Sequence, residues 1–319
     1  MKKIVLATTA LVLSTGVAAA EVKVGGNAWA GITYNSQPGF GINKTQVNTR
    51  LRFNFDASKQ LDSGVELGGR IRLQSDHDGE GRTASTLNMA SIFAKTGGLE
   101  VQVGNVEAAF DNLGLLYNSE LGYIGTTQGS YAFADYAGYV SRAYDTGQEN
   151  RMGVFVAYTV GDLVARMSYI TPNQVTKANQ AEELSVSFDY VAGPFSFGVG
   201  YANNAGFNSG NDVYALTGEY AINGATSVGL HYVDNGKIGG VDQGRNVTLY
   251  GKTSVGNGIG LGGFVSNIDS KALNASGVTK KTAYGIGFDY DLGGATLAGT
   301  VQRTHSSTTY ADLGINFSF

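Results

Sequence analysis

The sequence contains no cysteine, three prolines among 319 residues, and only 15% charged residues. The missing cysteines exclude a disulfide scaffold, a thiol nucleophile and a cysteine–zinc site. The scarcity of proline, together with the lack of a glycine triplet period, excludes collagen. The net charge of −4 is too small, and of the wrong sign, for a nucleic-acid binder. No nucleic-acid partner is therefore expected.

Long apolar runs are confined to the first residues of the chain. Lys2 and Lys3 precede an apolar stretch over 4–17, which ends in an A-x-A cleavage sequence. This arrangement predicts a secretory signal peptide over 1–20, because a membrane anchor needs about 20 apolar residues and different flanks. Cleavage would leave 21–319 as a single domain of 299 residues, with 20 basic and 26 acidic side chains and a net charge of −6. The protein is predicted to be exported.

The rest of the sequence alternates between apolar and polar residues. With 18 Tyr, 15 Phe and 42% hydrophobic residues, the chain has too much apolar surface for bulk disorder. A period of two is typical of strands that have one apolar and one polar face. Clear examples are Leu51, Phe53, Phe55; Leu184, Val186, Phe188, Tyr190; and Leu313, Ile315, Phe317, Phe319.

The connections between these segments alternate between short and long. Seven short and eight long connections predict sixteen strands, and 299 residues give about 19 for each strand with its connection. Each strand can then have the roughly 9–11 residues needed to cross a bilayer. The long connections lie near 36–45, 76–84, 105–150, 171–182, 203–211, 234–245, 268–281 and 304–308. An even number of strands, with short turns at one rim and long loops at the other, predicts an all-β transmembrane antiparallel barrel.

A barrel of sixteen strands is too wide for side chains to fill, so its interior is expected to be wet. A soluble sandwich would also alternate, but its inner faces would be apolar. A β-helix or an adhesin stalk predicts a fixed repeat period. In this sequence, residues 186–190 resemble residues 286–290, but this similarity occurs only once and no fixed repeat period is seen.

Several segments carry a resemblance to a known family. They are Glu21–Gly26, Thr49–Gly69 with the turn at 61–64, Val103–Phe110, Tyr284–Gly287, Tyr290–Gly294 and Ala311–Phe319. The chain resembles the general porins of alphaproteobacteria, in the Gram-negative porin family. The resemblance implies a sixteen-stranded homotrimer in the bacterial outer membrane, which passes ions and small hydrophilic solutes by passive diffusion. It also implies a third loop folded into the lumen. Phe319 resembles the signal read by the outer-membrane assembly machinery.

Four arginines share one face of two neighbouring strands. Arg50 and Arg52 alternate with apolar residues on the first strand, and Arg70 and Arg72 do so on the second. An arginine that faces lipid at the bilayer midplane costs about 2–4 kcal/mol, so all four are expected to face the lumen. A hairpin centred on Leu61 would place Arg52 opposite Arg70 and Arg50 opposite Arg72. Like charges directly opposite are unfavourable, so this ladder is expected to need a counter-charge.

The long loop over 105–150 carries the negative charge that the arginine ladder is expected to need. Its first 45 residues hold six acids and one arginine, for a net charge of −5. We expect the loop to enter the barrel as a constriction loop and to present Glu107, Asp111, Glu120 and Asp135 to the arginines. The resulting transverse field would order water and small ions, disfavour apolar solutes and filter by size. The simpler interpretation is that the arginines neutralise solvated carboxylates in an open lumen.

A second acidic cluster lies in the loop after the arginine hairpin. Asp76, Asp78 and Glu80 offer oxygen ligands for a structural Ca²⁺, although the full spacing of a calcium loop is missing. The alternatives are a solvated acidic loop or, by the resemblance, a latch onto the neighbouring subunit. No other metal or cofactor is expected, because His77, His231 and His305 are scattered along the sequence.

Three other functions remain as alternatives. An outer-membrane hydrolase would need a serine nucleophile near a histidine or paired carboxylates, and no G-x-S-x-G occurs, so no enzyme is predicted. A substrate-selective porin would need aromatic residues along the lumen, for which only Trp29 and Tyr310 fall on inward positions. A surface barrel or adhesin would have no conductance.

Overall fold

A computed structural model describes residues 20–39, 41–77, 83–125, 127–128, 150–176 and 180–319. Within this part of the chain, seventeen strands join in one antiparallel sheet. The strands of the sheet are β1 (Glu21–Asn35), β2 (Thr45–Gln60), β3 (Glu66–His77), β4 (Thr83–Leu87), β5 (Ser91–Thr96), β6 (Leu99–Gly104), β7 (Met152–Val160), β8 (Leu163–Thr171), β9 (Glu183–Ala192), β10 (Phe195–Asn203), β11 (Val213–Ala221), β12 (Thr226–Asp234), β15 (Arg245–Gly256), β16 (Ile259–Ile268), β17 (Thr282–Asp291), β18 (Ala295–Arg303) and β19 (Thr309–Ser318).

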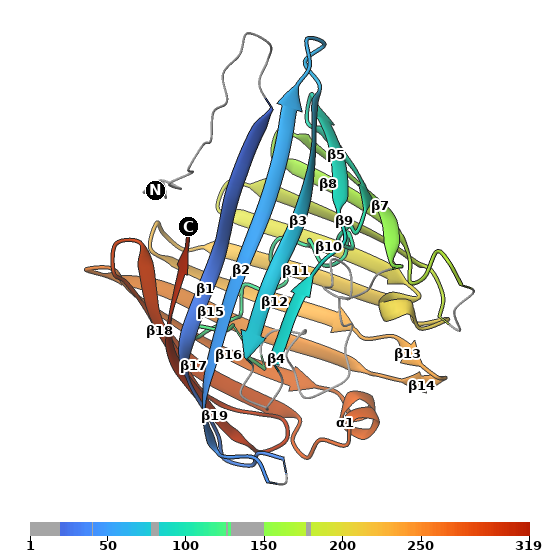
Figure 1. The fold of residues 1–319 in the computed structure, drawn as a ribbon. Coiled ribbons are helices and arrows are strands. Elements are labelled where there is room, and N and C mark those ends of the chain that lie inside the picture. The colour runs from blue at the N-terminus through green and yellow to red at the C-terminus, as the bar shows by residue number, and fades with distance from the viewer. Residues whose placement is uncertain (1–19, 40, 78–82, 126, 129–149, 177–179) are drawn as a thin grey trace.

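The sheet closes on itself as a barrel (Figure 1). Strand β1 pairs with β2 on one side and with β19 on the other, so that Ala28 stands between Leu51 and Phe317. Gly26 and Phe319 exchange backbone hydrogen bonds of 2.8 and 3.1 Å across the closure. The short and long connections fall where the sequence predicts them. No helix among the described residues is long and apolar enough to cross a membrane.

One strand of the barrel is interrupted. β4 and β5 both pair with β3, and residues 88–90 separate them. The side-chain oxygen of Asn88 accepts a hydrogen bond from the backbone N–H of Arg72, while the Asn88 N–H donates to the Arg72 carbonyl at 3.0 Å. The break therefore stays attached to the neighbouring strand. Counting β4 and β5 as one strand gives sixteen, which confirms the predicted sixteen-stranded barrel.

The two faces of the sheet have opposite character. On β2 the outward residues Val47, Leu51 and Phe55 are exposed apolar side chains, whereas Arg50 and Arg52 point inward with the other polar residues. The same alternation runs through the other strands, because successive side chains of a strand point to opposite faces. The arginines therefore face the lumen, as predicted.

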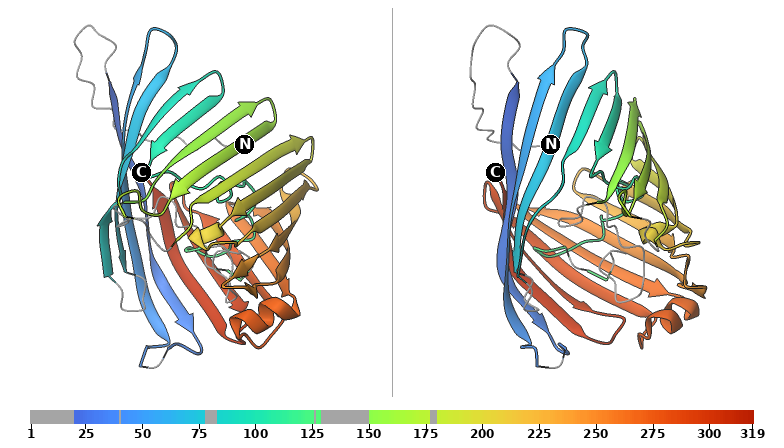
Figure 2. Two further views of the ribbon diagram at one scale, coloured as in Figure 1. Left: turned by 90° about the vertical axis from the view of Figure 1, so that its right-hand side faces the viewer. Right: turned by 45° about the vertical axis from the view of Figure 1, so that its right-hand side comes forward.

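The described parts of the long loop, 105–125 and 127–128, lie inside the ring of strands (Figure 2). Its first turns pack an apolar cluster against the inner wall of β7, β8 and β10–β12 and the short helix η2 (Ala205–Phe207). The loop contributes Val106, Ala108, Ala109, Phe110, Leu113 and Leu116, and the wall contributes Phe155, Ile170, Ala202, Ala205, Phe207, Val213, Ala215 and Val233. The larger apolar core of the described residues thus lies between the loop and the wall, and the prediction of an inserted loop is confirmed for the part of the loop that the structure describes.

Inward-facing glycines make room for the loop. A Cβ added to Gly314 would lie 2.6 Å from the Tyr123 ring, and one added to Gly262 would lie 2.5 Å from Leu121 Cδ2. At Gly262 the next nearest atom is 3.6 Å away, so a Cβ there would displace only the Leu121 side chain of the loop. Some of the 47 glycines of the chain therefore make room for the inserted loop.

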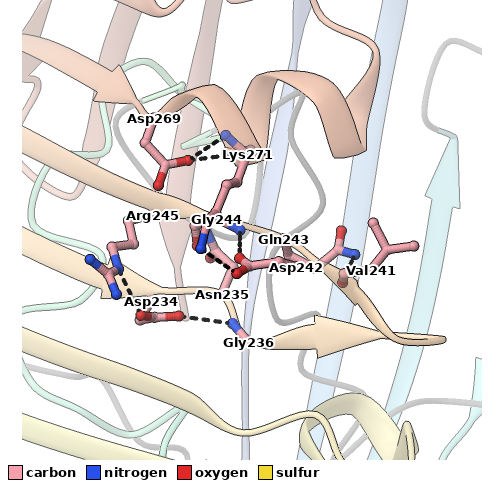
Figure 3. A network of polar contacts seen from close by, with 11 residues as sticks. Asp234, Asn235, Gly236, Val241, Asp242, Gln243, Gly244, Arg245, Asp269 and Lys271 are labelled. Carbon is pink, nitrogen blue, oxygen red and sulfur yellow. Dashed lines mark hydrogen bonds and ion pairs between the residues drawn. The ribbon is translucent and has the colours of Figure 1, made fainter.

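Two of the long loops are joined by a polar network at the long-loop rim (Figure 3). The hairpin of β13 (Lys237–Ile238) and β14 (Val241–Asp242) lies beside the helix α1 (Ser270–Ser276). Lys271 Nζ donates to Asp242 Oδ2 at 2.7 Å, and Asp269 caps the helix by accepting from the N–H of Lys271 at 3.0 Å. The hairpin and the helix are thereby held together.

Candidate functional site

The arginine ladder exists, but its register differs from the predicted one. The turn between β2 and β3 closes through a hydrogen bond of 2.8 Å from the Leu61 N–H to the Val65 carbonyl, and Gly64 takes a φ of +84°. The hairpin is therefore centred on Ser63, two residues beyond the predicted centre at Leu61. Each cross-strand partner therefore shifts by four residues, an even number, so the arginines stay on the inward face while their partners change.

Each arginine now faces an acceptor instead of another arginine. Arg50 is opposite Asp76, Arg52 opposite Gln74, Arg70 opposite Asp56 and Arg72 opposite Asn54. The Nε atom of Arg50 donates to Asp76 Oδ1 at 2.6 Å, and Arg70 Nη2 donates to Asp56 Oδ2 at 3.0 Å. Arg52 donates to Gln74, and Arg72 donates to Asn54 Oδ1 at 3.2 Å. The predicted opposition of like charges is wrong, because these strands carry their own acceptors.

The third loop meets the arginine ladder through an aromatic contact. The guanidinium carbon of Arg50 lies 5.1 Å from the centroid of the Trp29 ring, on β1. The ring of Trp29 stands edge-on to Tyr123 of the loop, with 5.6 Å between centroids. The Tyr123 N–H donates to Asp312 Oδ1 on β19 at 3.1 Å. Wall, tryptophan and loop thus form one continuous set of contacts.

Polar side chains of the inner wall hold the loop backbone along its length. Ser168 and Ser185 accept from the N–H groups of Ala109 and Phe110 at 2.8 and 3.2 Å. Further along, Asp189 accepts from the Gly114 N–H, Glu219 from the Asn118 side chain, and Gln302 from the Gln128 N–H, at 3.0, 3.1 and 2.8 Å. The loop therefore follows the wall from β8 round to β18 and β19, and β19 is separated from the first arginine strand, β2, only by β1.

Three of the four predicted loop acids lie on the described part of the loop. Glu107 is half-buried at its start, and Asp111 accepts a hydrogen bond from the Tyr117 hydroxyl. Glu120 lines a small recess of about 110 Å³ with Lys252 and Asp289 on the wall. Asp135 lies outside the described residues. The structure thus adds a lumenal lysine, Lys252, which periodicity alone did not single out.

The candidate calcium cluster is only partly visible. The Asp76 carboxylate pairs with Arg50, while Asp78 and Glu80 lie outside the described residues. Among the described residues, no group of three or more His, Asp or Glu side chains could hold a metal ion. Asp76 is accounted for as a partner in the ladder.

The last residue of the chain lies at the barrel closure. The ring of Phe319 stands edge-on to Phe53, with 5.4 Å between centroids, and is 6.2 Å from the ring of Phe317. These aromatic contacts join the end of β19 to β2 across β1. The sequence indicated this position through the alternation that ends at Phe319.

Sequence reasoning missed the wall residues that hold the loop. Asp189, Glu219 and Asp312 lie on inward positions of three distant strands, and each receives a hydrogen bond from the loop. All three are acidic residues on the polar face of a strand. This pattern indicates an inward position, because a charged side chain is not expected to face lipid. Trp29 was correctly placed inward, but its neighbours are Arg50 and Tyr123.

Comparison with protein families decides the class of this barrel. The family described as Gram-negative porin matches residues 7–309. The chain belongs to this family. A porin from Fuscovulum blasticum is 32% identical over 302 residues, which are 94% of this chain and 100% of the relative. A porin from Rhodobacter capsulatus is 26% identical over 333 residues, again 94% of this chain and 100% of the relative.

Solved porin structures have the same fold. A mutant of the Rhodopseudomonas blastica porin superposes with a TM-score of 0.82 at 31% identity, covering 93% of this chain and 100% of its own. A structure described under asymmetric conductivity of engineered proteins has the same TM-score and identity, and covers 94% of this chain and 100% of its own. The protein is a porin channel of the Gram-negative outer membrane, surrounded by lipid and open to small solutes. Family membership indicates a channel rather than an enzyme.

Proposed function

We propose that this porin is a general diffusion pore whose narrowest part lies between the arginine ladder and the inserted loop. The proposal rests on one observation: four inward arginines on β2 and β3 stand across the lumen from a loop that is bonded to the opposite wall. Ions and small hydrophilic solutes would pass by diffusion, and the gap would sieve them by size.

The charges on the two sides support a field across this gap. The ladder has four arginines against Asp56 and Asp76, for a net charge of +2, since 4 − 2 = 2. The loop sequence over 105–128 contains Glu107, Asp111 and Glu120 and no basic residue, for a net charge of −3. The ladder does not require the loop as a counter-charge, but opposite signs still face each other across the lumen.

Further parts of the proposal concern maturation and assembly. Residues 1–20 are a signal peptide removed after Ala20, and 21–319 form the mature barrel. The mature chain forms a homotrimer, and the assembly machinery of the outer membrane reads Phe319. The protein carries out no bond chemistry and needs no cofactor. The Gram-negative porin family and the porin neighbours support the homotrimer, whereas the maturation step rests on the sequence of residues 1–20.

A substrate-selective porin is less well supported. Its aromatic surface would have to be open to a sugar, yet the ring of Trp29 is packed between Arg50 and Tyr123. We therefore retain the general diffusion pore as the proposed function.

The test is single-channel recording in planar bilayers, with the unboiled mature protein. Ohmic steps that close in threes are expected for a trimer of open pores. In a salt gradient, a variant with Arg50, Arg52, Arg70 and Arg72 changed to Gln should move the reversal potential toward cation preference. Lys59→Gln, at the short-turn end of β2, is the control. An unchanged potential in the quadruple variant would disprove the field, and silence of a folded, inserted protein would disprove the open pore.

A further inference from the structure

A groove of about 840 Å³ lies on the outer face of β12 and β15–β18. Its floor is a row of cross-strand neighbours in which Val228, Gly251, Gly263, Ile286 and Val301 follow one another. Outward side chains of the next row, such as Leu249 and Tyr284, form one wall. Two glycines side by side leave the surface hollow, and Ile286 is 71% exposed, the largest value for any bulky apolar side chain in the described chain.

Packing within the chain does not demand these two glycines. A Cβ on Gly251 would have its nearest neighbour at 3.5 Å, and one on Gly263 at 3.4 Å, which are ordinary contact distances. Neither residue has a positive φ. Glycine inside a strand costs roughly 0.5–1 kcal/mol relative to alanine. The hollow therefore has no explanation inside the barrel, unlike the seat of Leu121 at Gly262.

One end of the groove is basic. Arg303 points outward one row beyond Val301 and faces Tyr284 across the strands. It donates to Thr309 Oγ1 at 2.8 Å, and no acidic side chain in the described part of the chain forms an ion pair with it. Lys280 and Lys281 precede β17 at the same rim, where the Lys280 N–H donates to the His305 carbonyl at 2.9 Å and Lys281 Nζ donates to Ser270 Oγ at 2.8 Å. The segments 278–286 and 299–310 thus contain three cations and no acid, in a chain of net charge −4.

We propose that this groove binds an anionic membrane lipid of the outer leaflet. An acyl chain would fill the hollow over Gly251 and Gly263, and the phosphate of the headgroup would be held by Arg303, Lys280 and Lys281. The long loops mark the extracellular end of such barrels, so this rim lies at the headgroups of the outer leaflet. A cation near an anionic lipid surface contributes enough to change affinity about fivefold. Charge and shape thus select the same ligand, a phosphorylated lipid.

The test is native mass spectrometry of the refolded mature protein in detergent, with diphosphorylated lipid A as the probe. Gly263→Val fills the groove, and the combined Lys280→Gln, Lys281→Gln and Arg303→Gln variant removes the cations. Gly218→Val is the matched control for filling, since Gly218 lies on an outward position of β11 with 3.8 Å to its nearest neighbour. Lys44→Gln, in the loop after β1, is the matched control for charge.

Retained lipid should fall about fivefold for each cation removed, and also in the filled variant, while both controls keep the wild-type level. Gly263→Ala is a milder filling variant if Gly263→Val does not refold. Equal retention in all variants would overturn the proposal, and loss in the charge variant alone would overturn the placing of the acyl chain. A change of oligomer mass in the filled variant with unchanged lipid would assign the groove to a second copy of the chain instead.

Discussion

Arg50 is held between Trp29 and Asp76: its guanidinium carbon lies 5.1 Å from the Trp29 ring centroid, and its Nε donates to Asp76 Oδ1 at 2.6 Å. The two partners come from the strands on either side of β2. Because Tyr123 of the inserted loop packs against the same tryptophan, the position of Arg50 is linked to the position of the loop. We therefore expect selectivity and sieving in this pore to depend on shared contacts.

Removing the tryptophan ring should loosen Arg50. In Trp29→Ala the cation–π contact, of about 0.5–1 kcal/mol at a partly exposed site, is lost, and so is the edge contact with Tyr123. We expect noisier single-channel currents and a weaker contribution of Arg50 to ion selectivity, whereas Trp29→Phe should keep most of both. Indistinguishable recordings from Trp29→Ala, Trp29→Phe and the wild type would contradict this link.

The carboxylates of the ladder should oppose the arginines in selectivity. Asp76→Asn removes one negative charge and raises the net charge of the ladder from +2 to +3. In a salt gradient the reversal potential should then move toward anion preference, the opposite direction to the arginine variants. The double variant Arg50→Gln/Asp76→Asn should return close to the wild-type potential. A shift toward cations in Asp76→Asn would refute the account of the ladder.

Displacing the loop should widen or block the pore without damage to the barrel. In Gly262→Val the new Cβ would lie 2.5 Å from Leu121 Cδ2 of the loop, whereas the nearest strand atom would lie 3.6 Å from it. We expect a single-channel conductance different from the wild type in a protein of unchanged thermal stability. The control is Gly218→Val on β11, which points outward and should leave conductance unchanged. Equal conductance in both variants would show that Leu121 does not fix the loop.

The link between the β13–β14 hairpin and α1 should resist acid. The hydrogen bond from Lys271 holds the pKa of Asp242 below its ordinary 3.8, and that of Lys271 is raised above 10.5 by Asp242. A carboxyl group whose pKa is lower in the folded than in the unfolded state stabilises the fold at pH values above its unfolded pKa. This stabilisation is lost only as the pH falls through the folded pKa. The contact should therefore persist from about pH 4 to pH 10 and open in more acidic solution.

Spin labels can follow this contact, because the native chain has no cysteine. Labels on Val241→Cys and Asn274→Cys should report one short distance between pH 4 and pH 10, with a longer distance appearing below. Asp242→Asn should show the longer distance already at neutral pH. A distance that changes near neutral pH in the otherwise native chain would rule out Asp242 as the titrating group.

Periodicity was enough to predict the barrel and its connections, because a strand that crosses lipid must alternate throughout its length. It was also enough to place the four arginines inward, since a charge at mid-bilayer has only that option. The predicted register between β2 and β3 was wrong because several residues of the turn Leu61–Val65 are able to occupy its centre. The resulting error of four residues in the pairing is even, so it leaves the faces unchanged and cannot be detected from a pattern of period two.

The contacts between the loop and the wall were beyond sequence reasoning for a different reason. Asp189 and Asp312 lie 75 and 189 residues from the loop residues they bind. Each is one polar residue among many on a wet face, and only the path of the loop selects it. The same holds for Trp29, whose inward position was predicted but whose neighbours depend on where the loop returns.

The backbone bonds between Gly26 and Phe319 have a consequence for how the gene can be arranged. Since the first and last strands are neighbours, the sheet is a ring and has no intrinsic starting point. Joining the present ends with a short linker and opening the chain at the turn Gly161–Asp162 would keep every strand beside its native neighbours. The aromatic residue now at the carboxyl end would then be internal, and a different strand would come last.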